Sequence, residues 1–205
     1  MQLLRRFGVV AVLAVASTSC GSVAQGRGPS FLVIESLQGI RGNTTPGQPS
    51  STLTSDVITN VSTPAPCTAE APCPTIFGDS GEATMRVVMK DAGAASPSTP
   101  SAINHITIER YHVQYIRADG RNTQGVDVPY EFDGAVRVTI ADSPTTFGFQ
   151  LVRNQAKDEA PLIFLRTNGA IVTTIGKVTF YGRDQNGNEI SIVGELTINF
   201  GNFGD

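Results

Sequence analysis

The sequence predicts an all-β protein of about eight to ten short strands, packed as an antiparallel β-sandwich. Short apolar or alternating runs recur from residue 31 onward, with turn-forming residues between them. The 205 residues include 21 Gly and 12 Pro but no Trp, and the frequent Val, Ile and Phe favour strands. An Asn-Gly dipeptide between two alternating runs near the C-terminus indicates a β-hairpin. A closed barrel is the alternative architecture.

The first 19 residues are predicted to be a secretory signal peptide and are left out of the fold. Arg5 and Arg6 precede an uncharged, mostly apolar run over residues 7–16, which is followed by small residues. A spanning helix needs about 20 apolar residues, and this run has about half that number. We therefore expect an exported protein.

Two ways of processing this leader remain open. Residues 14–16 (Ala-Val-Ala) fit the rule for ordinary signal peptidase, which would cut before Ser17 and leave a soluble periplasmic or secreted protein. Residues 17–20 resemble the lipobox of bacterial lipoproteins, and this resemblance implies that Cys20 takes a diacylglycerol and becomes the first mature residue. Of the three cysteines in the chain, lipidation of Cys20 leaves two to pair with each other in an oxidising compartment.

Residues 20–30 are predicted to be a lipidated, flexible tether, and residues 31–205 a single β-sandwich domain. Residues 21–30 are small and polar, and ten such residues reach about 15–20 Å. Gly21, rather than an aspartate, follows the cysteine. By resemblance to protein sorting in two-membrane bacteria, this favours the outer membrane.

The first half of the domain contains several predicted strands. Residues 31–37 form a continuous apolar run, which predicts a strand covered on both faces. Residues 52–61 are mixed, and residues 83–90 place alternate apolar side chains on one face. In residues 105–116 the alternation changes phase, which predicts a β-bulge near Glu109 and Arg110. The inward-facing residues are expected to be Met85, Val87, Met89, Ile106, Ile108, Tyr111, Val113 and Tyr115.

The second half continues the pattern with one interruption. Residues 135–141 and 146–152 alternate cleanly, whereas residues 155–159 indicate a helical turn that Pro161 ends, before a short buried run over residues 162–165. Gly194 is expected to be an irregular point in the last strand. The inward-facing residues are expected to be Val136, Val138, Ile140, Phe147, Phe149, Leu151, Val178, Phe180, Ile190, Ile192, Leu196, Ile198 and Phe200.

The final hairpin is the clearest local signal. Residues 185–188 join two strands, and both Asn186 and Gly187 accept the positive φ of a tight turn. The whole segment, residues 178–200, resembles the last hairpin of bacterial immunoglobulin-like and type III fibronectin-like modules. That resemblance implies an immunoglobulin-like sandwich that serves adhesion, spacing, or carbohydrate or protein binding.

Cys67 and Cys73 bracket five residues in a segment with four prolines. The spacing is too wide for a thioredoxin-type pair, and too few cysteines are present for a zinc site. We predict a disulfide that staples a long loop, with a rigid recognition loop as the functional alternative.

A candidate binding loop lies between two well-patterned strands, at residues 117–134. Long loops on a rigid scaffold carry binding residues, and Tyr and Arg side chains anchor many interfaces. The alternative is a solvated loop that covers the sandwich edge. The candidate residues are Arg117, Asp119, Arg121, Asp127, Tyr130 and Asp133.

We expect no cofactor and no metal. The one cation pattern considered is Asp184, Asn186 and Asn188, whose alternating oxygen ligands resemble the start of a calcium loop. It lacks the length and the closing glutamate of an EF-hand, so a hairpin turn is the simpler interpretation.

Catalysis is not expected. The stretch Gly78–Gly81 (Gly-Asp-Ser-Gly) resembles the nucleophile segment of chymotrypsin-like proteases, but His105 and His112 follow Ser80, an order that this family does not use. The simpler interpretation is a turn made by Asp79 and Gly81. A hydrolase with an unrecognised site is the third hypothesis, after the two exported forms.

The charge of the chain excludes nucleic acid as a partner. The formal net charge of −3 becomes −5 once the leader with its two arginines is removed, and no basic patch is present. The first hypothesis is therefore a non-catalytic cell-envelope lipoprotein that binds or spaces other components. Its partners would be the membrane, through the lipid, and another envelope protein or a glycan.

Overall fold

The computed structural model describes residues 28–91 and 93–204. The predictions about the leader, the cleavage site and Cys20 lie outside this part of the chain. Within it, strands dominate and helices are short, so the all-β prediction is confirmed.

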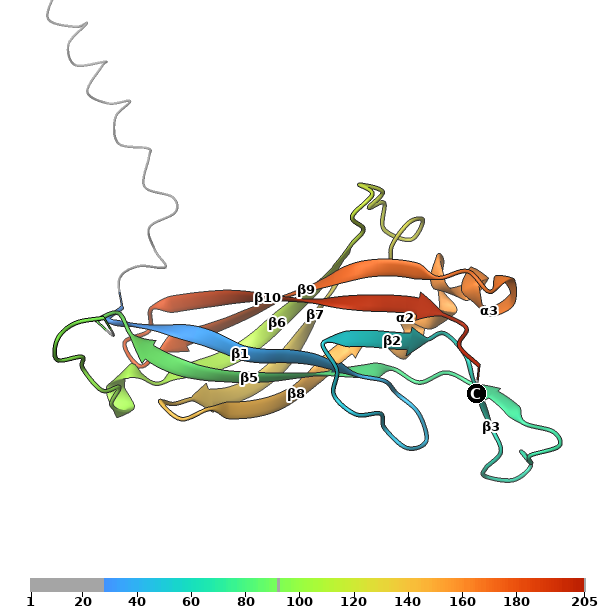
Figure 1. The fold of residues 1–205 in the computed structure, drawn as a ribbon, viewed down its shortest axis with the longest axis horizontal. Coiled ribbons are helices and arrows are strands. Elements are labelled where there is room, and N and C mark those ends of the chain that lie inside the picture. The colour runs from blue at the N-terminus through green and yellow to red at the C-terminus, as the bar shows by residue number, and fades with distance from the viewer. Residues whose placement is uncertain (1–27, 92, 205) are drawn as a thin grey trace, which may run out of the picture.

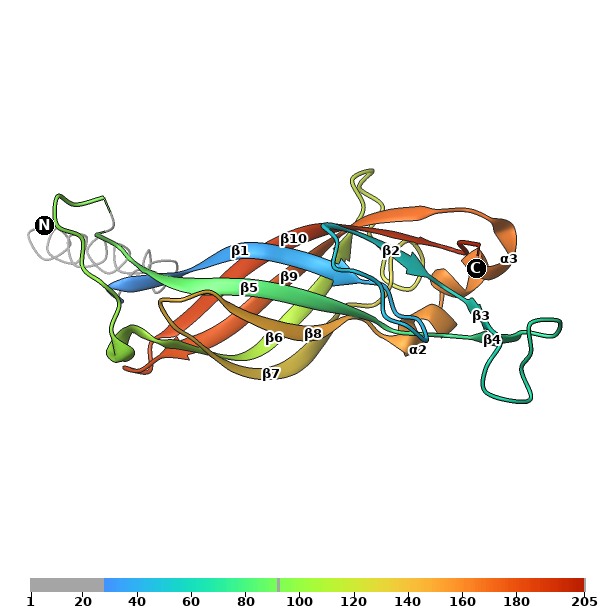
Figure 2. The same cartoon turned by 60° about the horizontal axis from the view of Figure 1, so that its bottom comes forward.

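Two sheets face each other along the long axis of the molecule (Figures 1 and 2). The smaller sheet is antiparallel, and the larger sheet curls around it. The smaller sheet has the order β1-β5-β8, with β1 (Ser30–Ile40), β5 (Asp79–Met89) and β8 (Thr145–Val152). The larger sheet has the order β2-β10-β9-β6-β7, with β2 (Thr52–Asp56), β10 (Glu189–Gly201), β9 (Val172–Asp184), β6 (Ile106–Ile116) and β7 (Phe132–Ile140).

Two features depart from the predicted short antiparallel strands. β2 pairs with β10 in parallel, from Thr52 opposite Thr197 to Asp56 opposite Gly201. Several strands are also long: β1, β5 and β6 have 11 residues each, and β9 and β10 have 13. A third, two-stranded sheet of β3 (Thr59–Val61) and β4 (Cys73–Thr75) projects from one end.

One apolar core fills the space between the two large sheets. At its centre, the Tyr111 ring from β6 contacts Phe149 from β8 and Phe180 from β9, with ring centroids 5.2 and 6.3 Å apart. Most residues predicted to face inward belong to this core or pack against it, which confirms the alternation patterns. The fully buried residues include Met85, Ile106, Ile108, Val113, Ile140, Leu151, Val178, Phe180, Ile198 and Phe200.

The bulge and the final hairpin lie where the sequence predicts them. The pairing of β6 with both neighbours shifts register between Ile108 and Arg110. β9 and β10 pair antiparallel across residues 185–188. The turn differs in detail, because only Gly187 has a positive φ (+82°) and Asn186 does not. The Gly187 N–H donates to the Asp184 carbonyl at 3.0 Å, and the Asp184 N–H donates to the Asn188 carbonyl at 3.1 Å, so the predicted segment 185–188 does join the two strands.

Two predictions about strand interiors were wrong. β1 is not covered on both faces: Leu32 is buried, but Phe31, whose side chain lies on the opposite face of the strand, is 41% exposed. Gly194 is not an irregular point, since it pairs in register with Val178. A Cβ at Gly194 would lie 2.9 Å from Cδ1 of Ile34, so the glycine makes room for β1 to pack on β10.

The helical segments connect strands at the two ends of the molecule. The predicted turn at residues 155–159 appears as α2 (Asn154–Asp158), followed by η3 (Leu162–Phe164) and α3 (Leu165–Asn168). The run at residues 162–165 is only half buried: Leu162 and Leu165 face the core, while Phe164 is exposed. The remaining short helix is η2 (Ala102–Asn104).

Candidate functional site

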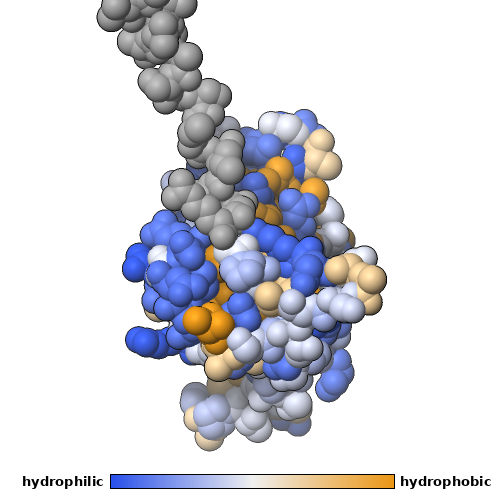
Figure 3. Space-filling model, turned by 90° about the vertical axis from the view of Figure 1, so that its left-hand side faces the viewer, coloured by the Kyte–Doolittle hydropathy of each residue, from blue (hydrophilic) through white to orange (hydrophobic). Residues whose placement is uncertain are grey.

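The end of the molecule opposite the start of β1 collects most of the irregular structure. We call it the loop end. It carries the β3–β4 hairpin, α2, α3 and the last described C-terminal residues (Figure 1). The other end, where β1 begins, shows mainly hydrophilic atoms with small apolar patches (Figure 3). The loop end is therefore the part of the surface where loops converge.

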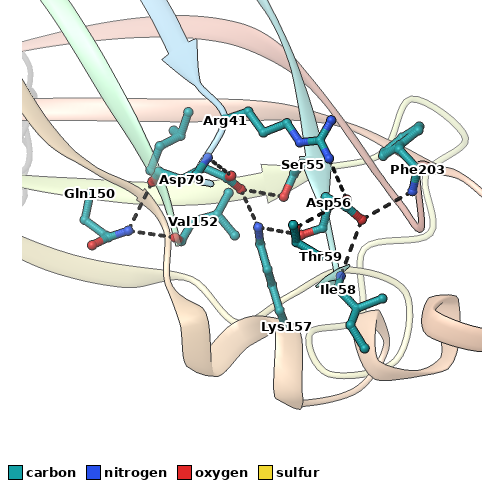
Figure 4. Close-up of polar contacts among 12 residues, drawn as sticks. Arg41, Ser55, Asp56, Ile58, Thr59, Asp79, Gln150, Val152, Lys157 and Phe203 are labelled. Carbon is teal, nitrogen blue, oxygen red and sulfur yellow. Dashed lines mark hydrogen bonds and ion pairs between the residues drawn. The ribbon is translucent and has the colours of Figure 1, made fainter. Parts of the chain in front are cut away.

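A buried ion pair lies beneath this end. Asp79, the first residue of β5, forms an ion pair with Lys157 of α2, with 2.9 Å between Lys157 Nζ and Asp79 Oδ2 (Figure 4). Both side chains are fully buried (0% exposed). Charged residues are almost never fully buried unless they are paired, so this pair is the most unusual electrostatic feature of the described chain.

Neighbouring groups saturate both partners of this pair. The Ser55 hydroxyl donates to Oδ2 of Asp79 at 2.6 Å, and the backbone N–H of Gly42 donates to Oδ1 at 2.8 Å. Lys157 Nζ also donates to the backbone carbonyl of Asp56 at 2.7 Å. Gln150 Nε2 donates to the backbone carbonyl of Asp79 at 3.1 Å. The site thus joins β2, β5, β8, α2 and the loop after β1.

A second acidic group lies beside the first. Arg41 forms an ion pair with Asp56 at 2.7 Å between Nη2 and Oδ2, and the Asp56 side chain is 1% exposed. The backbone N–H of Phe203 donates to Oδ1 of Asp56 at 3.2 Å. Asp56 therefore connects the loop after β1 to the C-terminal segment.

Burial sets the chemistry of Lys157. Removal from water disfavours the ammonium form and lowers the pKa of Lys157, although the carboxylates of Asp79 and Asp56 oppose the change. A lysine with a lowered pKa loses its proton more readily and forms the neutral, nucleophilic amine. The arrangement therefore holds a potential nucleophile in direct contact with a carboxyl group.

A polar groove opens on the surface next to this buried cluster. The backbone and side chains that line it come from the loop after β1, from β3 and its following loop, and from the C-terminal segment. Amide, hydroxyl and guanidinium groups dominate this lining. Its residues are Arg41, Asn43, Thr44, Thr59, Asn60, Val61, Ser62, Thr63 and Gly204.

The predicted disulfide is present. Cys67 and Cys73 are joined, with Cα atoms 5.3 Å apart, and the bond closes the loop between β3 and β4. Val61 of β3 pairs with Cys73 of β4, so the disulfide holds the hairpin that projects from the loop end.

The candidate binding loop is well ordered by its own contacts. Asp119 bridges two arginines, with Oδ2 2.6 Å from Arg117 Nη2 and 3.0 Å from Arg121 Nη2. The hydrogen bonds from Arg117 are the main cause of a lowered pKa at Asp119. Asp127 instead accepts from the Thr123 N–H at 3.2 Å.

The other two candidates of this loop have separate surroundings. Tyr130 is 49% exposed and packs against Gly125, where a Cβ would lie 2.3 Å from its hydroxyl oxygen. Asp133 lies in β7 and contacts His112 of β6, with 3.2 Å between Oδ1 and Nδ1. The structure therefore brings three of the six candidates together, namely Arg117, Asp119 and Arg121, and the other three do not join this cluster.

The residues of the calcium pattern make a hairpin turn. Oδ1 of Asp184 accepts from the N–H groups of Asn186 and Asn188, both at 2.9 Å, and Oδ2 accepts from the Asn188 side-chain amide at 2.8 Å. Burial by itself raises the pKa of Asp184, but these hydrogen bonds together outweigh burial, and the pKa is lowered. Within residues 28–91 and 93–204, no three His, Cys, Asp or Glu side chains are grouped so that they could hold a metal ion.

The protease-like stretch belongs to a strand. Asp79 and Ser80 open β5, so the predicted turn at this position was wrong. Ser80 is exposed and pairs with Gln150 of β8, whereas Asp79 points inward. The glycine before Asp79, Gly78, has no space for a side chain, because a Cβ there would lie 2.3 Å from Asn154 Oδ1.

The ion pair of Lys157 and Asp79 was not predicted from the sequence. Hydrophobic alternation treats charged residues as exposed, and these two residues are 78 positions apart in the printed numbering. The structure alone shows that Lys157 and its neighbour Ala156 are buried in α2.

Comparisons with known proteins leave the family open. No protein-family model matches the chain, and no curated protein matches it. A solved structure described as "X-ray structure of Northeast Structural Genomics Consortium target SoR45" is similar at 8% identity and a TM-score of 0.37, and the match covers 84% of this chain and 86% of that one. In the described ranges, no helix combines the length and hydrophobicity that crossing a bilayer requires.

Proposed function

We propose that this protein is a non-catalytic cell-envelope lipoprotein, acylated at Cys20, whose β-domain binds or spaces other envelope components through its loop end. One observation carries the proposal. The described chain begins, at Gly28 and β1, at one end of an elongated domain, and the disulfide-closed hairpin lies at the other (Figure 1).

This arrangement suits a module held at one end. A lipid on Cys20 would attach the domain at the end where β1 begins. A 13-residue strand such as β9 spans about 43 Å, and the tether adds about 15–20 Å. The loop end would therefore be presented well beyond the membrane surface, where another envelope protein or a glycan could reach it.

The loop end also has the surface that recognition needs. The polar groove beside β3 offers hydrogen-bonding groups such as Asn43, Asn60 and Thr63. The neighbouring hairpin is stapled by its disulfide, which reduces the conformational entropy lost on binding.

We further assign the domain to the immunoglobulin-like class of β-sandwiches. Two facing sheets built mainly from antiparallel neighbours support this assignment. The domain differs from a simple member of this class in two ways: β2 is parallel to its neighbour, and the larger sheet is curled.

Membrane fractionation of the full-length protein tests the anchor. We expect the wild-type protein in the membrane fraction, with a diacylated Cys20 as its first residue by mass spectrometry, and C20A in the soluble fraction with its fold intact. The matched control is the double variant C67S/C73S, which removes the other two cysteines and should stay in the membrane fraction. A soluble wild-type protein that begins at Ser17 would overturn the anchor and favour the secreted or periplasmic alternative.

Crosslinking in cells tests the orientation. A photoreactive residue at Ser62, beside the groove, should give adducts with another envelope component. The same residue at Ser98, an exposed position in the segment between β5 and η2, is the control and should give fewer adducts. More adducts from Ser98 than from Ser62 would contradict presentation of the loop end.

A further inference from the structure

We propose that Lys157 and Asp79 condense into an intramolecular amide bond in the folded protein, so that the buried ion pair is the precursor of a covalent crosslink between α2 and β5. The modification needs no enzyme and no cofactor. It is independent of the lipid anchor, because it depends only on groups inside the described domain.

The two reacting groups are already in contact and shielded from water. Lys157 Nζ lies 2.9 Å from Asp79 Oδ2, and both side chains are 0% exposed. Holding two reactants together in this way replaces a bimolecular step by an intramolecular one, with effective molarities of about 10⁵ M or more in well-oriented systems. Bulk water, which would favour hydrolysis of the product, is excluded from the site.

The ionised state of this site is costly, and the amide removes that cost. Removing two charges from water costs desolvation free energy, and their mutual attraction offsets only part of that cost. The low-dielectric surroundings also favour the neutral amine, as the lowered pKa of Lys157 indicates. Condensation replaces an ammonium and a carboxylate by one neutral amide, which the interior tolerates well when it is hydrogen-bonded.

The reaction balances with the groups present. A proton moves from the Lys157 ammonium to Oδ2 of Asp79, which leaves a neutral amine and a carboxylic acid. Nζ then attacks Cγ of Asp79 and forms the C–N bond, and negative charge develops on Oδ1. A second proton from Nζ passes to Oδ2 as the C–O bond breaks, so that this oxygen leaves as one molecule of water.

Two neighbours are placed to assist this reaction. The Gly42 N–H donates to Oδ1 at 2.8 Å, the position at which negative charge develops. The Ser55 hydroxyl donates to Oδ2 at 2.6 Å, the oxygen that leaves, and can relay the second proton. The Asp56 carbonyl, 2.7 Å from Nζ, holds the lysine in place. The precursor is thus surrounded by donors on the side of the carboxyl group.

Peptide mapping of the wild-type protein decides the proposal directly. After reduction of the disulfide and digestion, we expect a branched species in which the peptide containing Asp79 is joined to the peptide containing Lys157, lighter by one water molecule than their sum. Fragmentation should place the link on these two side chains. Separate, unmodified peptides from protein that has been kept folded would overturn the proposal, and this result does not depend on any variant folding.

Variants then assign the roles. K157M, which keeps the length of the side chain without the amine, should give only unlinked peptides. K177M, at a lysine on β9, is the matched control and should keep the crosslink. S55A should slow crosslinking of freshly refolded protein by about 10²-fold, in the range expected for loss of a proton-transfer group, and S55T should restore it. An unchanged rate in S55A would contradict the role of Ser55.

Discussion

The Tyr111 ring lies against the backbone of Gly134, its cross-strand partner in the pairing of β6 and β7. A Cβ at Gly134 would be only 2.1 Å from Cζ of Tyr111. The tyrosine hydroxyl accepts a hydrogen bond from the backbone N–H of Gln150 on β8, at 3.1 Å. The absence of a side chain at Gly134 therefore allows Tyr111 to link the two large sheets.

We expect G134A to destabilise the protein by about 1–3 kcal/mol, the usual cost of forcing extra volume into a packed site. The new methyl group would displace the ring and break its hydrogen bond to Gln150. Urea unfolding measures the effect. G148A on β8 is the control, because the nearest atom to its added Cβ is a Gly81 carbonyl oxygen at 3.8 Å. Equal stability of the two variants would contradict this account.

Y115F should reduce the free energy of unfolding by about 1–2 kcal/mol, because it leaves a buried acceptor without its partner. The Tyr115 hydroxyl donates to the Leu151 carbonyl at 2.8 Å, and the residue is 2% exposed. Y130F, at a tyrosine that is 49% exposed, should change stability by less than about 0.5 kcal/mol. Chemical denaturation of both variants checks the difference. A loss at Tyr130 that matches the loss at Tyr115 would be inconsistent with it.

Burial also raises the pKa of the Tyr115 hydroxyl. The group should therefore stay protonated in the folded protein at alkaline pH. Ultraviolet titration should give the same phenolate signal in the native wild-type protein and in native Y115F, because the buried hydroxyl contributes none. A smaller signal in native Y115F would show that Tyr115 ionises in the folded protein.

Loss of the disulfide should act locally. C67S/C73S removes a constraint on a small loop, which is worth about 2 kcal/mol in the loop-entropy model. Because β3 and β4 form a sheet of their own, we expect faster amide exchange in the three residues of β3 and at positions 73 and 75 of β4, where Pro74 between them has no amide N–H. Exchange in β6 and β9 should be unchanged. Equally fast exchange in the central strands would mean that the hairpin supports the whole core.

The lowered pKa of Asp184 predicts an acid-sensitive contribution to stability. A folded-state pKa below the ordinary 3.8 gives stability that is fully present above the unfolded pKa and is lost as the pH falls through the folded value. D184N should therefore flatten the decline in stability as the pH falls below the ordinary carboxyl pKa of 3.8. D142N, at an exposed residue between β7 and β8, should keep it. Thermal unfolding across this pH range measures both slopes.

The sequence predicted those parts of the fold that depend on neighbours along the chain. The phase change between Ile108 and Tyr111 gave the bulge, and the turn chemistry of Gly187 gave the hairpin. The parallel pairing of β2 with β10 was missed, because Thr52 and Thr197 meet only through the tertiary fold and carry no shared local pattern.

The candidate site was harder to predict for a related reason. The spacing of Cys67 and Cys73 is local, and the disulfide was foreseen. The ion pair of Asp79 and Lys157 depends on α2 folding back over the end of β5, and nothing in either local segment indicates that a charged side chain will be buried. Asp79 was therefore interpreted as a turn residue, although it begins a strand.

The position of β10 between β2 and β9 has a consequence for the order in which the larger sheet assembles. Both edges of β10 are paired, and β10 is the neighbour through which β2 joins the sheet. β2 therefore cannot take its place until β10, which comes after it and after β6, β7 and β9 in the chain, has docked. Pairing between segments so far apart in sequence slows folding.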